Sequence, residues 1–248
     1  MQERVLIVGA TSAIAQEMAR QYAARGARLF LIGRDAGKLD ALATSLGAAA
    51  VAGTRAADLT VTATAGALIA EAWAALGGID VACVAHGLLG DQQATERDLG
   101  EAERVISTNF VSVVALLIPL SNRLEAAGSG RIAVLSSVAG DRGRPRNYTY
   151  GSAKGALNVY LQGLRTRLWK SGVRVTTLKL GPVDTPMTAG HSKHILFAQP
   201  GAVAASALVA IDGGRGVAYV PWFWRPVLFV VRALPEPLLQ RLSFLAGR

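Results

Sequence analysis

Apolar runs of strand length alternate with amphipathic stretches of helix length along most of this chain. Residues 3–35 form an apolar run, a turn of small residues, an amphipathic stretch and a second apolar run that ends at Gly33-Arg34. This order predicts a βαβ unit, whose turn and helix N-terminus form an anion site for a pyrophosphate. Because strands and helices keep alternating, we expect a single-domain α/β fold: a Rossmann-like, doubly wound, mostly parallel sheet with helices on both faces.

The stretch LSSVAGDRGRPRNYTYGSAKGAL, residues 135–157, carries the candidate chemistry. Tyr150 and Lys154 stand at i and i+4, so on a helix their side chains share one face. Reduction of a ketone leaves negative charge on the carbonyl oxygen, and a phenol donates the proton when a nearby ammonium lowers its pKa. Ser137 would polarise the carbonyl through its hydroxyl. A tyrosine and a lysine at this spacing also occur by chance on amphipathic helices, so the pair needs support from its surroundings.

The first turn supplies such support. Gly9, Thr11 and Ser12 are small or polar enough to line an anion site. Here the chain resembles the short-chain dehydrogenase/reductase family, whose turn carries a glycine, three residues, a second glycine, one residue and a third glycine. Ala13 and Ala15 replace the second and third glycines. Either the cofactor accommodates two extra methyl groups, or the turn avoids positive φ at Ala13.

Other positions extend the resemblance from Val5 to about Pro221. It implies that Ser137, Tyr150 and Lys154 are catalytic, that Lys154 also holds the cofactor ribose, and that Asn109 holds a water for proton relay. It places Asp58 beside the adenine ring and Thr185 beside the nicotinamide carboxamide. The family's Asn-Asn-Ala-Gly is Val84-Ala85-His86-Gly87 in this chain. The cofactor-binding residues implied are Gly9, Thr11, Ser12, Ala13, Ile14, Arg34, Asp58, Leu59, Ala85, Gly87, Tyr150, Lys154, Gly181, Val183 and Thr185.

The end of the second strand distinguishes the two nicotinamide cofactors. A carboxylate there would bind the ribose diol of NADH, whereas an arginine would pair with the additional phosphate of NADPH. This chain has Arg34 at that position, which favours NADP(H). An ordinary surface role for the arginine leaves NAD(H) open.

The net charge is +9, and three of the arginines lie between Ser137 and Tyr150. Arg142, Arg144 and Arg146 would stand at the rim of the site and suit a phosphate-bearing substrate, or they belong to a solvated loop. His86 would lie near the nicotinamide pocket, either as a substrate contact or as a structural histidine. Residues 88–104 and 185–200 follow strand ends and are predicted substrate loops. Nucleic acid is not indicated, because the basic residues are scattered without interleaved aromatic residues.

The C-terminal segment is unusual in composition. It combines Trp222, Phe223, Trp224, Phe229 and Phe244 with Arg225, Arg232, Arg241 and Arg248. Arginine and proline interrupt its apolar run, so it is too short and too charged for a spanning helix of about 20 residues. We expect a membrane-surface contact, an oligomer interface or a flap over the substrate pocket. The predicted domains are 1–221, for dinucleotide binding and catalysis, and 222–248, an extension packed on or near it.

Composition also bears on location. Cys83, the only cysteine, lies in an apolar run, so no disulfide framework is expected and the compartment is a reducing one. Charged residues directly after Met1 are not typical of a secretory signal. We expect a cytoplasmic protein with contact at the inner membrane face, no bound metal, and, from the family resemblance, a homo-oligomer.

Within the family, the chain resembles decaprenylphosphoryl keto-ribose reductases. The matching segments are VAHGLLGDQ, AGDRGRPRNYTYGSAKGAL and VAYVPWFWRPVLFVVRALPEPLLQRL. This resemblance implies an NADPH-dependent carbonyl reductase that acts on a phosphorylated, lipid-linked keto-sugar, with Tyr150 as the general acid. Two other functions stay open: a generic NAD(P)-dependent ketone, ketoacyl or hydroxysteroid-like oxidoreductase, and a non-catalytic nucleotide-binding partner protein.

Overall fold

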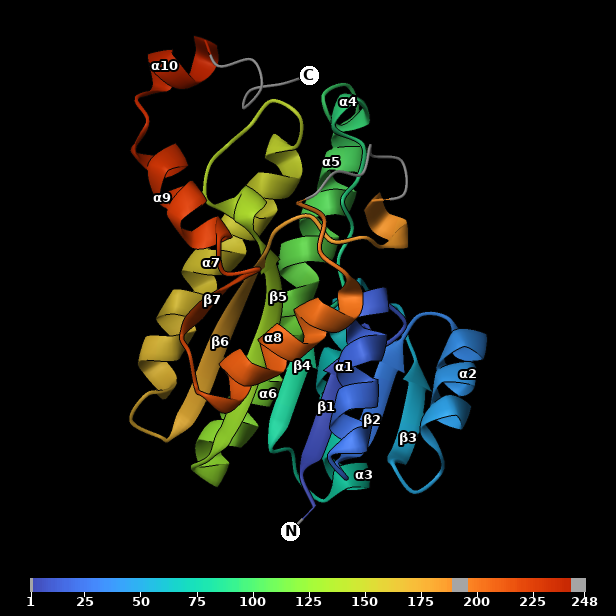
Figure 1. The fold of residues 1–248 in the computed structure, drawn as a ribbon. Helices are drawn as coiled ribbons and strands as arrows, with labels where there is room; N and C mark the ends of the chain where they lie inside the picture. Colours follow the sequence, from blue (N-terminus) through green and yellow to red (C-terminus); the bar gives the residue numbers. More distant parts are fainter. Residues whose placement is uncertain (1, 189–195, 242–248) are drawn as a thin grey trace.

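A seven-stranded sheet in the order β3-β2-β1-β4-β5-β6-β7 forms the centre of the protein (Figure 1). The computed structural model describes residues 2–188 and 196–241; Phe244, Arg248 and part of the predicted loop 185–200 lie outside them. Each strand pairs with its neighbours in parallel. The strands are β1 (Arg4–Val8), β2 (Arg28–Gly33), β3 (Val51–Ala56), β4 (Val81–Val84), β5 (Gly130–Ser137), β6 (Val173–Leu180) and β7 (Val217–Val220).

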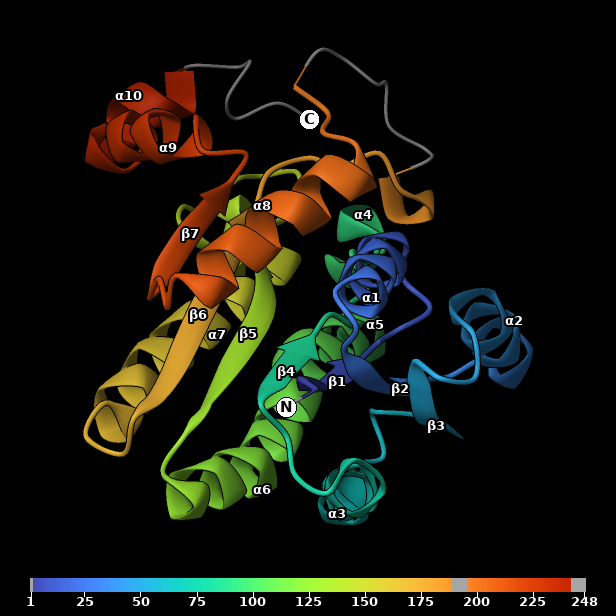
Figure 2. The ribbon, with the colours of Figure 1, turned by 60° about the horizontal axis from the view of Figure 1, so that its bottom comes forward.

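Helices cover both faces of this sheet, as Figure 2 shows. One layer contains α1 (Ala13–Ala24), α2 (Ala36–Leu46) and α8 (Pro200–Asp212), and the other contains α3 (Ala65–Leu76), α6 (Ser112–Ala127) and α7 (Tyr148–Leu168). The shorter helices are α4 (Gln92–Thr95), α5 (Leu99–Ile106), α9 (Trp224–Ala233) and α10 (Glu236–Arg241). The prediction of a Rossmann-like, doubly wound α/β domain is confirmed, and the described sheet is parallel throughout.

Four short helical turns complete the chain path. They are the 3-10 turns η1 (Thr62–Thr64), η3 (Val138–Gly140) and η4 (Pro186–Thr188), and the π-helical turn η2 (Ser107–Val111). Strand order reverses between β1 and β4, so the loops after these strands diverge and leave a crevice at the carboxyl edge. In Figure 1, α4, α9 and α10 rise above this same edge.

Helix α7 positions much of the candidate site, and its apolar spacing explains where it lies. Leu157, Leu161, Leu164 and Leu168 are buried at helical spacing against β5 and β6. Each such leucine contributes about 1.5–3 kcal/mol through burial. The polar residues of the first turns of α7 are thereby held at the carboxyl edge of the sheet.

One helical stretch, Leu99–Ala127, has the length and apolar composition of a membrane-crossing helix. Its residues Val113, Leu116, Leu117, Leu120 and Leu124 are buried in the core beneath the sheet. A core helix of a doubly wound sheet has the same composition, which accounts for the stretch.

Candidate active site

Ser137, Tyr150 and Lys154 lie together at the carboxyl end of β5. Ser137 is the last residue of this strand, and its hydroxyl accepts a hydrogen bond from the Ala139 amide at 3.1 Å. Tyr150 and Lys154 stand one turn apart at the start of α7, with Lys154 Nζ 5.8 Å from the centroid of the Tyr150 ring, and the Ser137 side chain is near enough to lower the pKa of Tyr150. A hydroxyl, a phenol and an ammonium therefore surround one point, the arrangement that ketone reduction requires.

The η3 turn packs closely against α7 at three glycines that were not among the predicted site residues. A Cβ on Gly140 would lie 2.6 Å from the Lys154 carbonyl carbon and 2.7 Å from the Gly155 nitrogen. A Cβ on Gly151 would lie 2.8 Å from the Ala139 oxygen, and one on Gly155 would lie 3.2 Å from the Gly140 oxygen. Any side chain at Gly140 or Gly151 would push the turn away from the helix. The glycines that follow Ser137, Tyr150 and Lys154 in the sequence could have indicated this close packing of η3 against α7.

Burial governs the protonation of the tyrosine and lysine. Lys154 is buried, its Nζ donates to the Leu135 carbonyl at 3.0 Å, and burial lowers its pKa to about 8. Burial raises the pKa of Tyr150 to about 12, and the nearby Ser137 side chain acts in the opposite direction. The lowering of the phenol pKa that we expected from Lys154 is wrong: burial raises this pKa, and Lys154 is not among the groups that shift it. The phenol holds its proton at neutral pH, as a proton donor must.

Asn109 ties the loop after β4 to the helix that precedes α6. It is fully buried in the π-helical turn η2. Its Oδ1 accepts from the Leu88 amide at 3.1 Å, and its Nδ2 donates to the carbonyls of Leu88 at 2.6 Å and Val105 at 2.8 Å. A Cβ on Gly87 would lie 2.8 Å from Asn109 Oδ1 and 3.6 Å from Lys154 Nζ, so this loop also contacts the catalytic group. The relay role of Asn109 stays a prediction.

The turn after β1 has the shape of a phosphate cradle. Gly9 has φ +78°, and a Cβ there would lie 2.5 Å from the His86 nitrogen, so only glycine fits. Ser12 caps α1 by accepting from the Ala15 amide at 3.3 Å. No non-glycine residue in the described chain has positive φ, so the turn avoids that conformation at Ala13. The Ala15 side chain is fully buried in the core, so the cofactor need not accommodate its methyl group.

Amide groups at the start of α1 are suited to an anion. Ala13 and Ile14 occupy the first helical turn, where backbone N–H groups lack an intrahelical acceptor and the helix dipole is positive. The Thr11 side chain contacts the end of β2, because a Cβ on Gly33 would lie 3.2 Å from Thr11 Cγ2. A dinucleotide fits this cradle: its pyrophosphate would be held by the amides of Ala13 and Ile14.

The adenosine side of the predicted site is open and polar. Arg34 is exposed directly after β2, and Asp35 caps α2 by accepting from the Lys38 amide at 3.0 Å. Asp58 accepts from the Thr60 amide at 2.9 Å and the Thr60 hydroxyl at 2.8 Å. These bonds, with Arg34 nearby, hold the pKa of the Asp58 carboxyl below its usual value.

Two further predicted cofactor residues on this side contribute mainly to packing. Leu59 is 5% exposed and belongs to the core cluster on the α3 side of the sheet. Ala85 is 8% exposed, and its amide donates to the Val8 carbonyl at 2.8 Å. Their cofactor contacts stay predictions.

His86 makes the contacts of a structural histidine. Its Nε2 lies 2.8 Å from the Ser112 hydroxyl, which itself donates to the Thr108 carbonyl, so Nε2 carries the ring proton. Burial, together with Lys154 and Arg34, lowers the pKa of His86 to about 3, and its Nδ1 is buried without a partner. The predicted substrate contact is untested. Across residues 2–188 and 196–241, no three His, Cys, Asp or Glu side chains are grouped as a metal site requires.

The segment after β6 meets the C-terminal extension. The Gly181 amide donates to the Val220 carbonyl at 3.0 Å, and the indole of Trp224 covers Gly181 so closely that a Cβ there would lie 2.0 Å from Trp224 Nε1. That Nε1 is buried and has no hydrogen-bond partner. Trp224 was not a predicted site residue, yet it lies against Gly181, which is a predicted cofactor residue.

Val183 and Thr185 continue this segment. Val183 is 5% exposed and forms a parallel bridge with Ala198. The Thr185 amide donates to the Thr188 hydroxyl at 3.2 Å, which holds the η4 turn. The predicted carboxamide contact of Thr185 is untested.

The three arginines between Ser137 and Tyr150 have different surroundings. Arg142 pairs with Glu236 at 2.7 Å and donates to the Arg232 carbonyl at 3.3 Å, so it joins the loop to α9 and α10. Arg144 is half-buried, burial and Arg146 lower its pKa, and no carboxylate in the described chain pairs with it. Arg146 is exposed. Arg142 is therefore engaged within the protein, whereas the Arg144 guanidinium has no carboxylate partner among residues 2–188 and 196–241.

A buried polar cluster lies directly behind this loop. Lys179 forms an ion pair with Asp141, and the Tyr219 hydroxyl donates to Asp141 Oδ2 at 2.7 Å. Lys179 Nζ lies 5.3 Å from the centroid of the Tyr219 ring. Burial and Asp141 raise the pKa of Tyr219 to about 12, against the effect of Arg232. The cluster connects η3, β6, β7 and α9.

Residues 3–195 match the sequence profile of the family described as short chain dehydrogenase. An uncharacterized oxidoreductase of Mycobacterium tuberculosis is 38% identical over 96% of both chains. One of Streptomyces coelicolor is 36% identical over 96% of this chain and 95% of its own. A hydroxysteroid 11-beta-dehydrogenase 1-like protein of Xenopus tropicalis is 32% identical over 94% of this chain and 84% of its own.

Solved structures share the fold. Levodione reductase superposes with a TM-score of 0.79 at 23% identity, over 89% of this chain and 97% of its own. A polyketide ketoreductase crystallised with NADPH gives the same TM-score, identity and coverage. At this level of identity, the two structures establish the architecture and nothing finer.

Proposed function

We propose that this chain, which belongs to the short-chain dehydrogenase/reductase family, reduces a ketone with NADPH. Family membership rests on the matched profile and on relatives along nearly the whole chain, and it makes the protein an NAD(P)(H)-dependent oxidoreductase. Two features support the preference for NADPH. Arg34 is exposed at the end of β2, and the neighbouring carboxylate of Asp35 is engaged as a helix cap.

The constellation of Ser137, Tyr150 and Lys154 is the observation that supports the reaction. Bound nicotinamide would supply the hydride. The Tyr150 phenol, protonated because it is buried, donates its proton to the carbonyl oxygen. The Ser137 hydroxyl orients that oxygen, and the buried Lys154 ammonium stabilises the phenolate that remains. The hydrogen bond from Lys154 to Leu135 holds the ammonium in place.

The proposed substrate is a phosphorylated, lipid-linked keto-sugar. Arg144 supports this proposal, because its guanidinium is half-buried, finds no carboxylate partner in the described part of the chain, and is costly to bury unless an anion binds it. The similarity of the catalytic helix and the C-terminal segment to decaprenylphosphoryl keto-ribose reductases points the same way. Arg142 is not part of the proposed phosphate site, since Glu236 already neutralises it.

A second candidate substrate class is a hydrophobic ketone without phosphate. The hydroxysteroid dehydrogenase-like relative, at 32% identity, favours this alternative. It assigns no role in binding to Arg144, and therefore the two candidates make different predictions for the same variant.

NADPH oxidation by the purified protein tests the proposal. The substrates are a prenyl-phosphoryl keto-pentose, the unphosphorylated keto-pentose and a panel of small ketones, and the blank is Tyr150→Phe. Selective turnover of the prenylated phosphate, absent in Tyr150→Phe, is the expected result. Turnover confined to simple ketones would refute the proposal of a phosphorylated substrate. Turnover that survives in Tyr150→Phe would refute the assignment of Tyr150 as the general acid.

Arg144→Gln then locates the phosphate site. We expect KM for the phosphorylated substrate to rise at least about tenfold while kcat/KM for a small ketone stays within about twofold, because a charge-assisted hydrogen bond is worth about 1.5–3 kcal/mol. The matched control is Arg28→Gln, which removes one exposed arginine at the amino end of β2. Equal losses of kcat/KM on both substrates would show that Arg144 stabilises the fold and does not bind the phosphate.

A further inference from the structure

Helix α9 exposes the face that a helix on a protein surface usually buries. Trp224, half-buried against Gly181, and the buried Leu228 attach it to the domain. On its outer side, Phe229 and Val230 are 76% and 58% exposed, and Trp222 just before the helix is 77% exposed. Large exposed apolar groups that cluster in this way mark an interaction surface.

Arginines are spaced among these apolar groups without any acidic residue. The chain contains no Asp or Glu between Asp212 and Glu236, while Arg215, Arg225 and Arg232 fall within that stretch. Arg225, Phe229 and Arg232 follow at helical spacing on α9, so their side chains lie along one stripe, and Trp222 stands in the turn before it. Aromatic and basic residues on one stripe suit an anionic, partly apolar partner.

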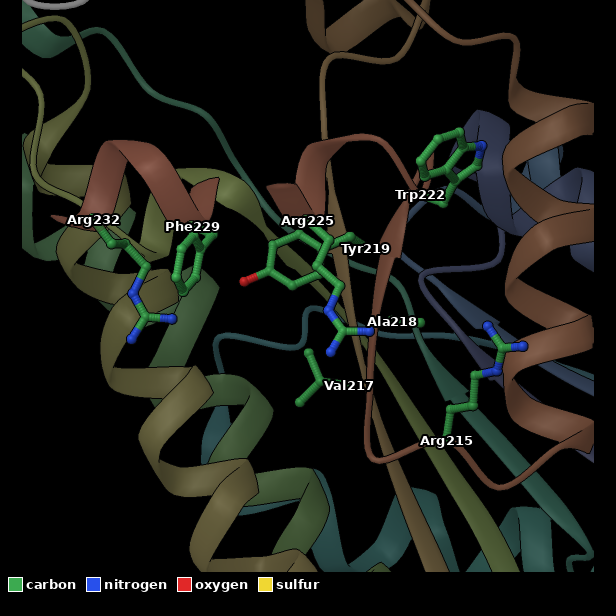
Figure 3. Close-up of a pocket in the computed structure, with 8 residues that line it drawn as sticks. All are labelled: Arg215, Val217, Ala218, Tyr219, Trp222, Arg225, Phe229 and Arg232. Atoms are coloured by element: carbon green, nitrogen blue, oxygen red, sulfur yellow. The ribbon is translucent and has the colours of Figure 1, made fainter. Parts of the chain in front are cut away.

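The arginines of this stripe border a pocket of about 400 Å³ along β7, the edge strand of the sheet (Figure 3). Figure 3 shows Arg225 in the middle of the pocket, with Arg232 and Phe229 on one side and Arg215 on the other. No carboxylate in the described part of the chain pairs with Arg215 or Arg225. Two unpaired guanidinium groups at one pocket favour a phosphate group.

The surface is held in place before any partner binds. Arg142 on the loop before α7 pairs with Glu236 of α10 and donates to the Arg232 carbonyl. The buried cluster of Asp141, Lys179 and Tyr219 supports the same end of α9 through the interaction between Tyr219 and Arg232. A partner therefore meets a preformed face and does not have to order it.

We propose that the stripe and pocket formed by Trp222, Arg225, Phe229, Arg232 and Arg215 are a docking site for an anionic lipid bilayer. Trp222 and Phe229 enter the headgroup region, and the guanidinium groups bind lipid phosphates. Helix α9 lies near the carboxyl edge of the sheet, the edge at which β5 ends in Ser137 (Figure 1). This inference does not depend on the identity of the ketone.

Sedimentation of the purified full chain with vesicles tests the docking site. Vesicles of phosphatidylcholine with one-third phosphatidylglycerol are compared with pure phosphatidylcholine at low and high salt. Binding to the anionic vesicles, weakened by salt, is expected because each basic residue near such a surface contributes about fivefold. Equal binding to both compositions, or binding to neither, would overturn the proposal.

Variants assign the binding to this surface. Arg215→Gln/Arg225→Gln should reduce the partition constant about 25-fold, and Trp222→Ala/Phe229→Ala at least about tenfold. The matched controls are Arg28→Gln/Arg123→Gln on β2 and α6, and Trp169→Ala at the end of α7, which is 60% exposed. Controls that lose as much affinity as the tested variants would overturn the assignment.

Two further measurements distinguish other occupants. Size-exclusion chromatography of Trp222→Ala/Phe229→Ala reports whether the surface joins two copies of the chain; a change from oligomer to monomer would overturn the bilayer proposal. Titration with inorganic phosphate reports a soluble anion; saturable binding that requires Arg225, without vesicle binding, would overturn it too. Turnover of a small ketone should be unchanged in each surface variant, which shows that the fold is intact.

Discussion

Asp141→Asn should destabilise the protein far more than the loss of a surface ion pair. The side chains of Lys179 and Asp141 are only 11% and 4% exposed, and Tyr219 donates to the same carboxylate at 2.7 Å. An asparagine keeps the shape but removes the charge that compensates Lys179. Breaking a buried pair from one side costs about 3–5 kcal/mol, because the remaining charge stays buried.

For a domain of this length, a loss of about 3 kcal/mol lowers Tm by about 6–12 °C. Urea unfolding followed by circular dichroism gives the free energy, and a thermal scan gives Tm. The matched control is Glu101→Gln, which breaks the exposed pair with Arg104, whose side chains are 36% and 51% exposed. We expect that control to lose less than about 1 kcal/mol.

The double variant Asp141→Asn/Lys179→Met isolates the uncompensated charge. Since the methionine removes the ammonium that has lost its partner, the double variant should recover at least about 2 kcal/mol relative to Asp141→Asn. Two outcomes would refute the reasoning: a single-variant loss below about 1 kcal/mol, or strictly additive effects in the cycle.

Three other substitutions test the site. Gly9→Ala should lose at least about 1 kcal/mol of stability and most NADPH affinity, because Gly9 has φ +78° and a Cβ would lie 2.5 Å from the His86 nitrogen. The control Gly66→Ala, in open space on α3, should not be destabilised. Equal losses in the two variants would contradict the role of Gly9. Lys154→Met should stabilise the protein at pH 7 by up to about 3 kcal/mol, because burial lowers the folded-state pKa from 10.5 to about 8. Between about pH 8 and 10.5, only the unfolded parent keeps the Lys154 proton, so the parent gains stability as pH rises. The extra stability of Lys154→Met should therefore disappear over this range. Extra stability that does not change with pH would argue against burial of the ammonium as the cause. Arg34→Glu should weaken NADPH binding by about tenfold or more and leave NADH binding nearly unchanged, as measured by fluorescence titration. If the ratio of the NADPH and NADH dissociation constants does not change, Arg34 does not select the cofactor.

Much of the fold followed from local pattern. The strand, small-residue turn and helix at residues 3–35 predicted the first βαβ unit, and the structure has β1, α1 and β2 there. The spacing of Tyr150 and Lys154 predicted a shared helix face, which α7 provides. These inferences succeeded because periods of 2 and 3.6 residues depend on a few neighbouring positions.

The surroundings of the site residues could not be obtained in this way. Arg142 and Glu236 are 94 positions apart. Nothing in the loop sequence indicates that an acid on α10 neutralises this arginine while no carboxylate of the described residues pairs with Arg144. The contact of Trp224 with Gly181 likewise depends on how α9 crosses the end of β6. Such contacts depend on how whole helices and strands pack, and the spacing of residues along the chain does not contain this information.

The sequence by itself determined the order of elements, the family, and the residue types that can transfer a proton to a ketone. Only the tertiary structure decided the effective chemistry of those residues. Burial, which is a property of the assembled chain, raises the pKa of Tyr150 above its ordinary value and lowers that of Lys154. The tertiary structure also places Asp141 beside Lys179 and leaves Trp222 and Phe229 exposed. The physical reason is that desolvation and long-range charge pairing arise from the three-dimensional surroundings of a group, whereas helix and strand periodicity arises from its neighbours in the chain.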